Sequence, residues 1–539
     1  MISYFQEPFT NDEQATLLQY VSNVDEPVFM LTHLPQATAA ALFARYSRSP
    51  KSLRRLLLDE FLTEGDRIHE SDAGDAVGME RATDLFRRVL SDYGDDSVAQ
   101  LAMVQIACEQ VSQLLAKQLE WGRLAAYLEQ STRYIPYTDK PNGSYRYVRD
   151  GAVISSPAGE QYVAAMDKLF DTYSAILPEL RTHLEHAVPE AEDAKARSVA
   201  IRALALDIAR ALLPAGTVSN VGICATPQAL EQMVYRLRAH PLPEAKYYGD
   251  RIAASLTATI PSFVSRIARP ERGGAWQEYL ADRDDAVRKA ASAFDAPQAP
   301  LGEGPSIRLV DWDPDGEARV LAGSLYSASA RSFDGLLADM RELDAERTRE
   351  LFQTVTGERR NRRHRPGRGF EYTSYTFDCI SDFGAFRDLQ RHRMLTIQWQ
   401  KLTPAFGYDV PQEVVAIGWE QAWRDAVGQA EKAYEALVDA GLPEQAQYCV
   451  TLGHKMRYSM QLNAREALHM IELRTSPQGH ASYRRICQAM FDEIANTAKH
   501  RNIAEAMKFV GMEDVHLPRY HEAVRSGHDH AAVPAGEKE

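Results

Sequence analysis

Residues 370–393 have the sequence FEYTSYTFDCISDFGAFRDLQRHR. The first nine residues are rich in aromatic and β-branched side chains, a composition typical of a β-strand. An amphipathic helix is expected over residues 379–390, and it leads into Arg391, His392 and Arg393 at a turn. The stretch therefore predicts a strand, a helix and a cationic turn in succession.

The turn Arg391-His392-Arg393 combines two guanidinium groups with an imidazole. Guanidinium groups bind phosphate oxygens through paired hydrogen bonds, and free backbone N–H groups at a following helix start would add to such an anion site. A surface charge cluster is the more common explanation of a short basic run. Both interpretations stay open for this motif taken alone.

A second motif, NAREALHMIELR, occupies residues 463–474. Asn463 followed by Glu466 predicts a capping box at the start of a helix. Three polar side chains are expected to share the outward face of this helix, opposite its apolar face: Arg465, His469 and Glu472. Arg465 and Arg474 lie beside an apolar stretch, which makes them candidates for ligand binding.

Composition and charge limit the class of protein. The chain has 539 residues, of which 45% are hydrophobic and 25% charged, as expected for a globular protein of two to four domains. Its net charge of −14, from 61 basic and 75 acidic residues, makes a nucleic-acid partner unlikely on this pattern. No apolar run approaches the ~20 residues that span a bilayer, so no membrane partner is expected. The first residues have no signal-peptide pattern, and five scattered cysteines without a CxxC pair predict reduced thiols, a cytoplasmic protein and no metal site.

Helical periodicity dominates the rest of the sequence. Helices are expected over residues 98–120, 161–186, 194–213, 415–441 and 480–509. Short strands are expected over residues 28–31, 307–310 and 370–378. These segments predict a mixed protein with much helix and a modest amount of sheet.

An internal repeat lies on either side of a Pro- and Gly-rich linker, residues 292–305. Each half has a helical segment that runs into an Arg-containing turn, at 118–134 and 389–408. Each half later has a helix that ends in Leu-Arg, at 227–239 and 463–475. The common order favours duplication and divergence, and chance sharing of Leu-Arg pairs is the alternative.

The turn of the first half contains a polar run between two tyrosines. Its members are Glu129, Gln130, Ser131 and Arg133. Hydrogen-bond acceptors, a hydroxyl and an arginine beside aromatic rings suit a sugar-phosphate whose flat base can stack. An ordinary exposed turn explains the same residues equally well.

The second half resembles the flavin-dependent thymidylate synthases. The strand, the thirteen residues from Asp378 to Gln390, the Arg-His-Arg turn and the later NAREALHMIELR segment reproduce the order and spacing of that family. The resemblance is clear over residues 306–515 and weak over residues 27–270. It implies the α+β fold class, with two tandem thymidylate-synthase-complementing-protein-like domains, each helix-rich with a small mixed or antiparallel sheet.

The first half is similar to a divergent copy of the second. Trp121-Gly122-Arg123 takes the place of the Arg-His-Arg motif, and Ser131 and Arg133 follow at the family's spacing. The expected organisation is an N-terminal extension (1–26), a first divergent domain (27–291), a linker (292–305), a second domain (306–520) and a flexible tail (521–539).

The resemblance implies a division of labour between the halves. The second half has residues at the family's flavin-binding positions: Arg391, His392, Arg393, Asn463, Arg465 and His469, the last in place of the usual Asn. The first half has residues at the nucleotide-binding positions: Gln118, Glu129, Ser131, Arg133, Arg210 and Arg238. Arg474 matches an arginine near the pyrimidine nucleotide, whereas Lys401, Thr403 and Gln447 replace nucleotide-binding residues in the second half. One composite site per chain is expected.

The activity implied by the resemblance is C5 methylation of a uridylate-type pyrimidine nucleotide such as dUMP. Methylenetetrahydrofolate would donate the carbon, and FAD, reduced by NADPH, would donate hydride. The candidates for a catalytic role are Ser131, Arg133, Arg210 and Arg474. A homodimer that forms a pseudo-tetramer is also implied, because active sites of the family lie between subunits.

Two further hypotheses remain open from the sequence. The family usually has a histidine shortly before the strand, but Asp95 and Pro366 occupy these positions. On the first hypothesis, the loss of this histidine means that the chain is a catalytically inactive or repurposed flavin- or nucleotide-binding paralogue. Alternatively, the basic run RRNRRHRPGR at residues 359–368 binds RNA or another polyanion, which the net charge of −14 disfavours.

Overall fold

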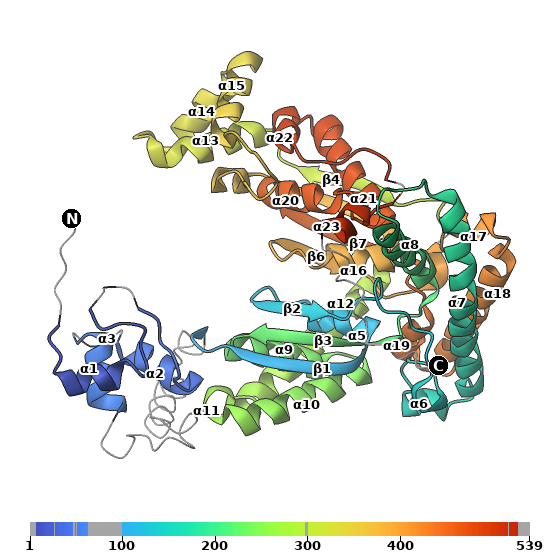
Figure 1. Cartoon of the computed structure of the whole chain (residues 1–539), viewed down its shortest axis with the longest axis horizontal. Coiled ribbons are helices and arrows are strands. Elements are labelled where there is room, and N and C mark those ends of the chain that lie inside the picture. The colour runs from blue at the N-terminus through green and yellow to red at the C-terminus, as the bar shows by residue number, and fades with distance from the viewer. Residues whose placement is uncertain are drawn as a thin grey trace. The chain divides into compact units, whose positions relative to one another are not determined.

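The computed structural model describes residues 7–25, 27, 29–46, 49, 51–62, 100–296, 300–515 and 517–525 (Figure 1). Asp95 lies outside this range, as do residues 526–539 of the expected tail. Among the residues described, no helix combines the length and the apolar character that crossing a membrane requires.

Two compact units make up the structure. Unit 1 consists of the segments Met1–Glu109, Gly122–Glu129 and Asn220–Asp295. Unit 2 consists of the segments Gln110–Trp121, Gln130–Ser219 and Ala296–Glu539. Much of the helical part of the first half therefore belongs to the same unit as the second half. The domain limits expected from the sequence repeat stay a prediction.

Unit 1 contains a three-stranded sheet in the order β1-β3-β2. The strands are β1 (Val104–Ser112), β2 (Ala125–Glu129) and β3 (Val218–Ala225). Strands β2 and β3 are antiparallel, with Tyr127 opposite Ile223. Helix α9 packs against α10 and α12 beside the sheet. The helices of this unit are α1 (Asn11–Leu17), α2 (Gln36–Tyr46), α3 (Leu53–Leu56), α9 (Pro227–Ala239), α10 (Pro243–Thr259), α11 (Pro261–Val264) and α12 (Ala275–Ala291).

Unit 2 contains a four-stranded antiparallel sheet in the order β4-β5-β7-β6. The strands are β4 (Ser306–Trp312), β5 (Ser374–Asp382), β6 (Leu395–Trp399) and β7 (Lys455–Asn463). The alternation of side chains in β5 places Tyr375 and Phe377 in the core, where both are fully buried. Tyr458 and Met460 of β7 are buried in the same way. The expected antiparallel sheet is confirmed.

Unit 2 also contains helices from both halves of the sequence. The long helices α7 (Gly159–Ala187) and α18 (Glu420–Asp439) pack against each other (Figure 1). Their apolar faces supply the fully buried Phe170 and Tyr173 from α7 and Trp423 from α18. The other helices are α5 (Gln113–Leu119), α6 (Gly151–Ile154), α8 (Ala194–Ala209), α13 (Gly316–Leu325), α14 (Phe333–Arg341), α15 (Ala345–Thr356), α16 (Phe383–Leu389), α17 (Gln412–Ala416), α19 (Pro443–Ala446), α20 (Ala464–Arg474), α21 (Ala481–Asp492), α22 (Arg501–Ala506) and α23 (Tyr520–Arg525).

The sequence repeat is visible as repeated local structure. Six elements follow in the same order in each half, with further helices between them: β1, α5, β2, α7, β3 and α9 in the first, and β5, α16, β6, α18, β7 and α20 in the second. The backbone N–H of Gln113, at the start of α5, donates to the Thr217 carbonyl at 3.0 Å. At the equivalent start of α16, Phe383 donates to the His454 carbonyl at 2.9 Å. This shared bond supports duplication over chance similarity.

Several sequence-based expectations about elements are wrong. The helix expected over residues 98–120 is the strand β1 followed by the seven-residue helix α5. Likewise, residues 379–382 complete β5, so the helix expected from 379 begins only at Phe383. In both places the pairing of the strand with a distant partner overrides the local helical spacing. The strand expected over residues 370–378 begins only at Ser374, after a 3-10 helix over Arg368–Tyr372. Residue 31 forms only an isolated bridge with Val21, although a strand was expected there. The helical segments expected over residues 118–134 and 389–408 contain the strands β2 and β6.

Candidate functional site

Arg133 and Asp207 form a buried ion pair in unit 2. Arg133 follows β2, and Asp207 lies on α8. The Arg133 Nε and Nη2 atoms donate to the two carboxylate oxygens at 2.6 and 2.7 Å, which is bidentate geometry. Burial acts to raise the pKa of the Asp207 carboxyl, but Arg133 outweighs this effect and lowers the pKa to about 2. Arg133 also donates through Nη1 to the Tyr483 hydroxyl at 3.2 Å.

Asp388 connects two further arginines. Its carboxylate lies 3.8 Å from Nη2 of Arg210 and 3.7 Å from Nη1 of Arg474. Arg474 also donates through Nη2 to the Asp388 carbonyl at 2.5 Å. Arg210 is 4% exposed, and its Nη2 atom makes no hydrogen bond among the described residues. A buried guanidinium with an unused donor is a natural contact for an oxyanion.

Arg519 is the fourth arginine of this region, and its Nη2 atom lies 3.7 Å from Oδ2 of Asp207. Its buried Nη1 atom also lacks a hydrogen-bond partner within the described part of the chain. We call Arg133, Arg210, Arg474 and Arg519 with Asp207 and Asp388 the arginine cluster. Four guanidinium cations face two carboxylate anions, so the cluster carries an excess of positive charge in a buried setting. Such an excess favours the binding of an anion.

His392 links the arginine cluster to the start of α20. Arg474 donates through Nε to Nε2 of His392 at 3.0 Å. Because Nε2 accepts this bond, the imidazole proton lies on Nδ1, which donates to Oε1 of Glu466 at 2.9 Å. Burial lowers the pKa of His392 to about 4, so its ring is neutral at pH 7. Burial opposes ionisation of Glu466, yet the hydrogen bonds from His392 and His469 lower the pKa of Glu466 to about 2.

The sequence predicts a capping box at Asn463, and the structure contains half of it. The Asn463 side chain accepts from the Glu466 N–H at 2.9 Å, which caps α20. The Glu466 carboxylate turns to His392 instead of returning to the cap. The Nδ2 donor of Asn463 has no partner in the described part of the chain, so it is available to a ligand.

Of the flavin-binding candidates, Asn463, Arg465 and His469 belong to this helix or its cap, and His392 contacts it through Glu466. Arg391 is exposed and Arg393 is half-buried after α16. Arg465 donates to the Pro366 carbonyl at 3.0 Å and pairs with Glu371 at 3.3 Å. N–H donors on guanidinium, carboxamide and imidazole groups suit the carbonyl and phosphate oxygens of a flavin nucleotide. The residues present therefore fit this group.

His392, Glu466 and His469 also resemble a metal-binding triad. Their ligand atoms lie within 4.8 Å of one another. A cation on Nδ1 of His392 would move the proton to Nε2, where it would oppose the donated bond from Arg474. The hydrogen bonds therefore account for the cluster without a metal ion.

The structure places the remaining candidates as follows. Gln118 lies on α5 in unit 2, and Ser131 accepts from the Arg133 N–H at 3.2 Å. Glu129 and Arg238 belong to unit 1, where Arg238 pairs with Asp250 at 2.7 Å. Unit 2 thus brings Arg133, Arg210 and Arg474 together around the two buried aspartates. His392 joins this group through its hydrogen bond with Arg474.

In the second half, internal contacts take up the residues that replace nucleotide-binding positions. Lys401 forms an ion pair with Glu444. Gln447 accepts from the Leu402 N–H at 3.1 Å, and Thr403 caps a short 3-10 helix.

Sequence reasoning missed Asp207, Asp388, Tyr483 and Arg519. A signal for the two aspartates exists, because each stands three residues before a candidate arginine, Arg210 or Arg391, inside a largely apolar helix. A carboxylate in such a position needs a cationic partner. No comparable signal marks Arg519, which lies near the end of the chain.

The fold and the arginine cluster define a helix-rich α+β protein built from two related halves. The model of the thymidylate synthase complementing protein family matches residues 30–262 and 308–498, and the chain belongs to this family. The two matched regions confirm the tandem resemblance to flavin-dependent thymidylate synthases.

Relatives of similar length come from bacteria and an archaeon. A UPF0159 protein of Chlamydia muridarum is 37% identical over 518 residues, which cover 95% of this chain and 97% of the relative. A UPF0159 protein of Chlamydia pneumoniae is 36% identical over 96% of this chain and 98% of its own. A third UPF0159 protein, from Thermoplasma acidophilum, is 29% identical over 90% of this chain and 97% of its own. The alignments extend over both halves.

Among solved structures, the UMP/dUMP methylase PolB from Streptomyces cacaoi, bound with 5-Br dUMP, matches 39% of this chain and 98% of its own. The two are 20% identical, with a TM-score of 0.31.

Proposed function

We propose that this protein methylates C5 of a uridylate-type nucleotide, dUMP, with methylenetetrahydrofolate as the carbon donor and NADPH as the reductant. The reaction would take place in one composite site per chain. Family membership supports the reaction class. The observation that carries the proposal is the contact of Arg133 with Tyr483, together with the bridge that Asp388 forms between Arg210 and Arg474.

The arginine cluster would bind the nucleotide. The unused donors on Arg210 and Arg519 suit the oxygens of a phosphate group, and the excess positive charge suits its two negative charges. Arg474, held by His392 and Asp388, would donate to a pyrimidine carbonyl oxygen. A donor so fixed stabilises negative charge that develops on the ring when C5 attacks the methylene carbon.

The start of α20 would hold FAD through Arg391, Arg393, Asn463, Arg465 and His469. The flavin supplies hydride chemistry when it is bound. The neutral His392 orients Arg474 and accepts its N–H. With its proton on Nδ1 and a pKa near 4, His392 remains a fixed hydrogen-bond partner across the physiological pH range.

The test is direct. The purified protein is expected to show flavin absorbance and to release tritium from C5-labelled dUMP when methylenetetrahydrofolate and NADPH are present. Arg133→Ala is expected to remove nucleotide binding, and Arg465→Ala flavin binding. Binding of both ligands without tritium release would favour the repurposed paralogue, for which Pro366 in place of the family's histidine is the supporting observation. Unchanged binding in both variants would exclude the composite site.

We also propose that two chains associate as a homodimer with a tetramer-like arrangement of four related halves. Closed symmetry of this kind follows from duplication of a subunit that assembles as a tetramer. Light scattering on the purified protein is expected to give twice the chain mass, and a monomer would contradict the proposal.

A further inference from the structure

The basic run at residues 359–368 is anchored by its first residue. Arg359 is 5% exposed and forms a bidentate ion pair with Glu472, at 2.7 and 2.5 Å. It also donates to the carbonyl oxygens of Ala506 and His364. The sequence interpretation that placed Glu472 on an outward polar face of α20 is therefore wrong, because Glu472 is buried by this pair. The anchor fixes the rest of the run in one place.

The anchored segment folds into a compact loop. The His364 N–H donates to the Asn361 carbonyl at 3.1 Å, and the Arg363 N–H donates to Oδ1 of Asn361 at 2.9 Å. This loop presents three guanidinium groups that form no ion pair or hydrogen bond with any residue described by the structure: Arg362, Arg363 and Arg365. Three unpaired arginines on one short loop are unusual in a chain whose net charge is −14.

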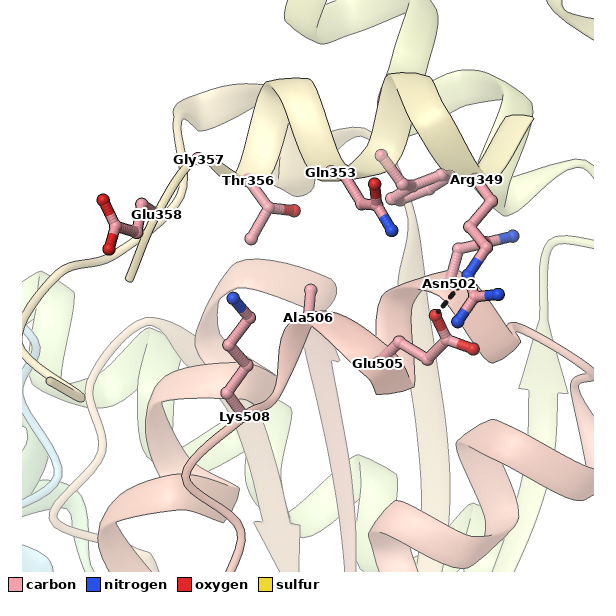
Figure 2. Close-up of a pocket in the computed structure, with 10 residues that line it drawn as sticks. Arg349, Gln353, Thr356, Gly357, Glu358, Asn502, Glu505, Ala506 and Lys508 are labelled. Atoms are coloured by element: carbon pink, nitrogen blue, oxygen red, sulfur yellow. Dashed lines mark hydrogen bonds and ion pairs between the residues drawn. The ribbon is translucent and has the colours of Figure 1, made fainter. Parts of the chain in front are cut away.

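A pocket of about 360 Å³ adjoins the loop (Figure 2). It lies between α15 and α22, and Phe352 and Ala506 give it an apolar surface. Figure 2 shows Lys508 extending toward α15 from the opposite side of the pocket. Lys508 has no ion pair among the described residues, and the buried Thr356 hydroxyl has no hydrogen-bond partner there. The pocket thus offers an ammonium group, and its lining also includes the carboxylates of Glu358 and of Glu505, the latter paired with Arg349.

The segment that leads into the loop also lines the pocket. Gly357 and Glu358 line the pocket and directly precede Arg359. Arg359 donates at 2.6 Å to the carbonyl of Ala506, which lines the opposite side. A ligand in the pocket therefore lies beside the start of the positively charged loop. Such a preformed arrangement lowers the entropic cost of binding an anion.

We propose that the loop and the pocket form a binding site for a phosphorylated small molecule. Its phosphate groups bind Arg362, Arg363, Arg365 and Lys508, and its uncharged part occupies the pocket beside Phe352. The volume lies within the range of small-molecule sites, about 300–1,000 Å³. This site is additional to the arginine cluster, and it does not depend on methyl transfer.

Nucleic acid is the less suitable partner. A long polyanion extends beyond the loop and meets a surface with an overall excess of acidic groups, where like charges repel. A small phosphorylated ligand contacts only the positively charged loop and the pocket. Charge and size therefore both favour the small molecule.

Calorimetric titration of the full chain with ATP, pyrophosphate and adenosine tests the site. ATP is expected to bind more tightly than pyrophosphate or adenosine, because it uses both the loop and the pocket. The triple variant Arg362→Gln/Arg363→Gln/Arg365→Gln is expected to weaken ATP binding at least about tenfold, since each charge-assisted hydrogen bond contributes a substantial part of the affinity. Lys508→Gln is expected to weaken ATP and pyrophosphate binding, and adenosine binding much less.

The matched control removes the same charge from arginines that already have acidic partners. Arg181, Arg331 and Arg424 are exposed and pair with Glu185, Asp339 and Glu420 respectively. The triple Gln variant at these positions is expected to bind ATP as the wild type does, with both triple variants folded by circular dichroism.

Three results would overturn the proposal. They are no ATP binding by the wild-type chain, equal ATP affinity in the two triple variants, and tighter binding of a single-stranded RNA oligonucleotide than of ATP. None of these measurements requires flavin or methyl transfer, so failure here is distinguishable from failure of the proposed function.

Discussion

Arg133 donates a hydrogen bond through Nη1 to the hydroxyl of Tyr483 at 3.2 Å, so a guanidinium of the first half and a phenol of the second half meet inside unit 2. Tyr483 lies on α21, close to the second half's Arg474, whose guanidinium lies 5.4 Å from the same ring. The two arginines therefore share one aromatic neighbour. This relationship is what a composite site requires, because each half supplies part of one cationic surface.

Removal of the Asp207 carboxylate is expected to destabilise unit 2. Asp207→Asn leaves the buried Arg133 guanidinium without its bidentate partner, and breaking such a pair costs about 3–5 kcal/mol. Urea denaturation followed by circular dichroism measures the loss. Asp285→Asn is the control, because Asp285 forms only exposed pairs on α12 and its removal is expected to leave the midpoint unchanged. An unchanged midpoint in Asp207→Asn would contradict the buried ion pair.

Lowering the pH is expected to destabilise the protein already at pH values well above the pKa of its carboxylates. Burial lowers the pKa of His392 to about 4 and that of His480 to about 3, below the ordinary value of 6.5. The unfolded chain then binds more protons than the folded chain below pH 6.5, so stability falls as the pH falls. From pH 7 to pH 5 the loss is about 2 kcal/mol for each histidine.

The histidine contribution can be isolated with one variant. His480 caps α21 through a bond from the Ser482 N–H, and an asparagine can replace that cap. His480→Asn is therefore expected to fold and to show a smaller loss of melting temperature between pH 7 and pH 5. A slope equal to that of the wild type would show that His480 does not titrate on unfolding in this range.

Nucleotide affinity is expected to depend on the first half and not on the replaced positions of the second. Arg210→Gln removes a buried guanidinium with an unused donor, so dUMP affinity is expected to fall by roughly 10- to 100-fold. Lys401→Gln removes a cation that is already paired with Glu444, and dUMP affinity is expected to stay the same. Equal effects in a calorimetric titration would mean that both halves bind nucleotide.

His469 is expected to limit flavin affinity. It stands where the family usually has Asn, and its ring lies 5.2 Å from that of His392. His469→Asn exchanges a ring for a smaller carboxamide with both a donor and an acceptor, which is expected to strengthen FAD binding up to about tenfold. Quenching of flavin fluorescence on titration measures the change. Weaker binding in the variant would contradict this prediction and would show that histidine is the better flavin ligand at this position.

Local sequence patterns predicted the elements that depend on neighbouring residues. Composition indicated the strand β5, although over residues 370–378 and not over Ser374–Asp382. Capping chemistry indicated the start of α20 at Asn463, and the period indicated the helices α7 and α18. The strand β1 could not be predicted in this way, because its pairing with β3 comes from residues far along the chain.

Local sequence patterns could not predict the charged partners of the candidate site. The sequence indicated Arg133, Arg210 and Arg474, but the aspartates that join them act only when three distant helices meet. Glu472 shows the same limit, because helical spacing placed it outside whereas Arg359 draws it into the core. Polar residues inside a fold depend on long-range partners, and a single sequence does not reveal these pairs.

The most direct test of the composite site is the number of dUMP molecules bound by each chain. Calorimetric titration of the FAD-loaded protein is expected to give one dUMP per chain, with binding lost in Arg133→Ala and retained in Lys401→Gln. Two dUMP molecules per chain, or undiminished binding in Arg133→Ala, would contradict a single site built from both halves.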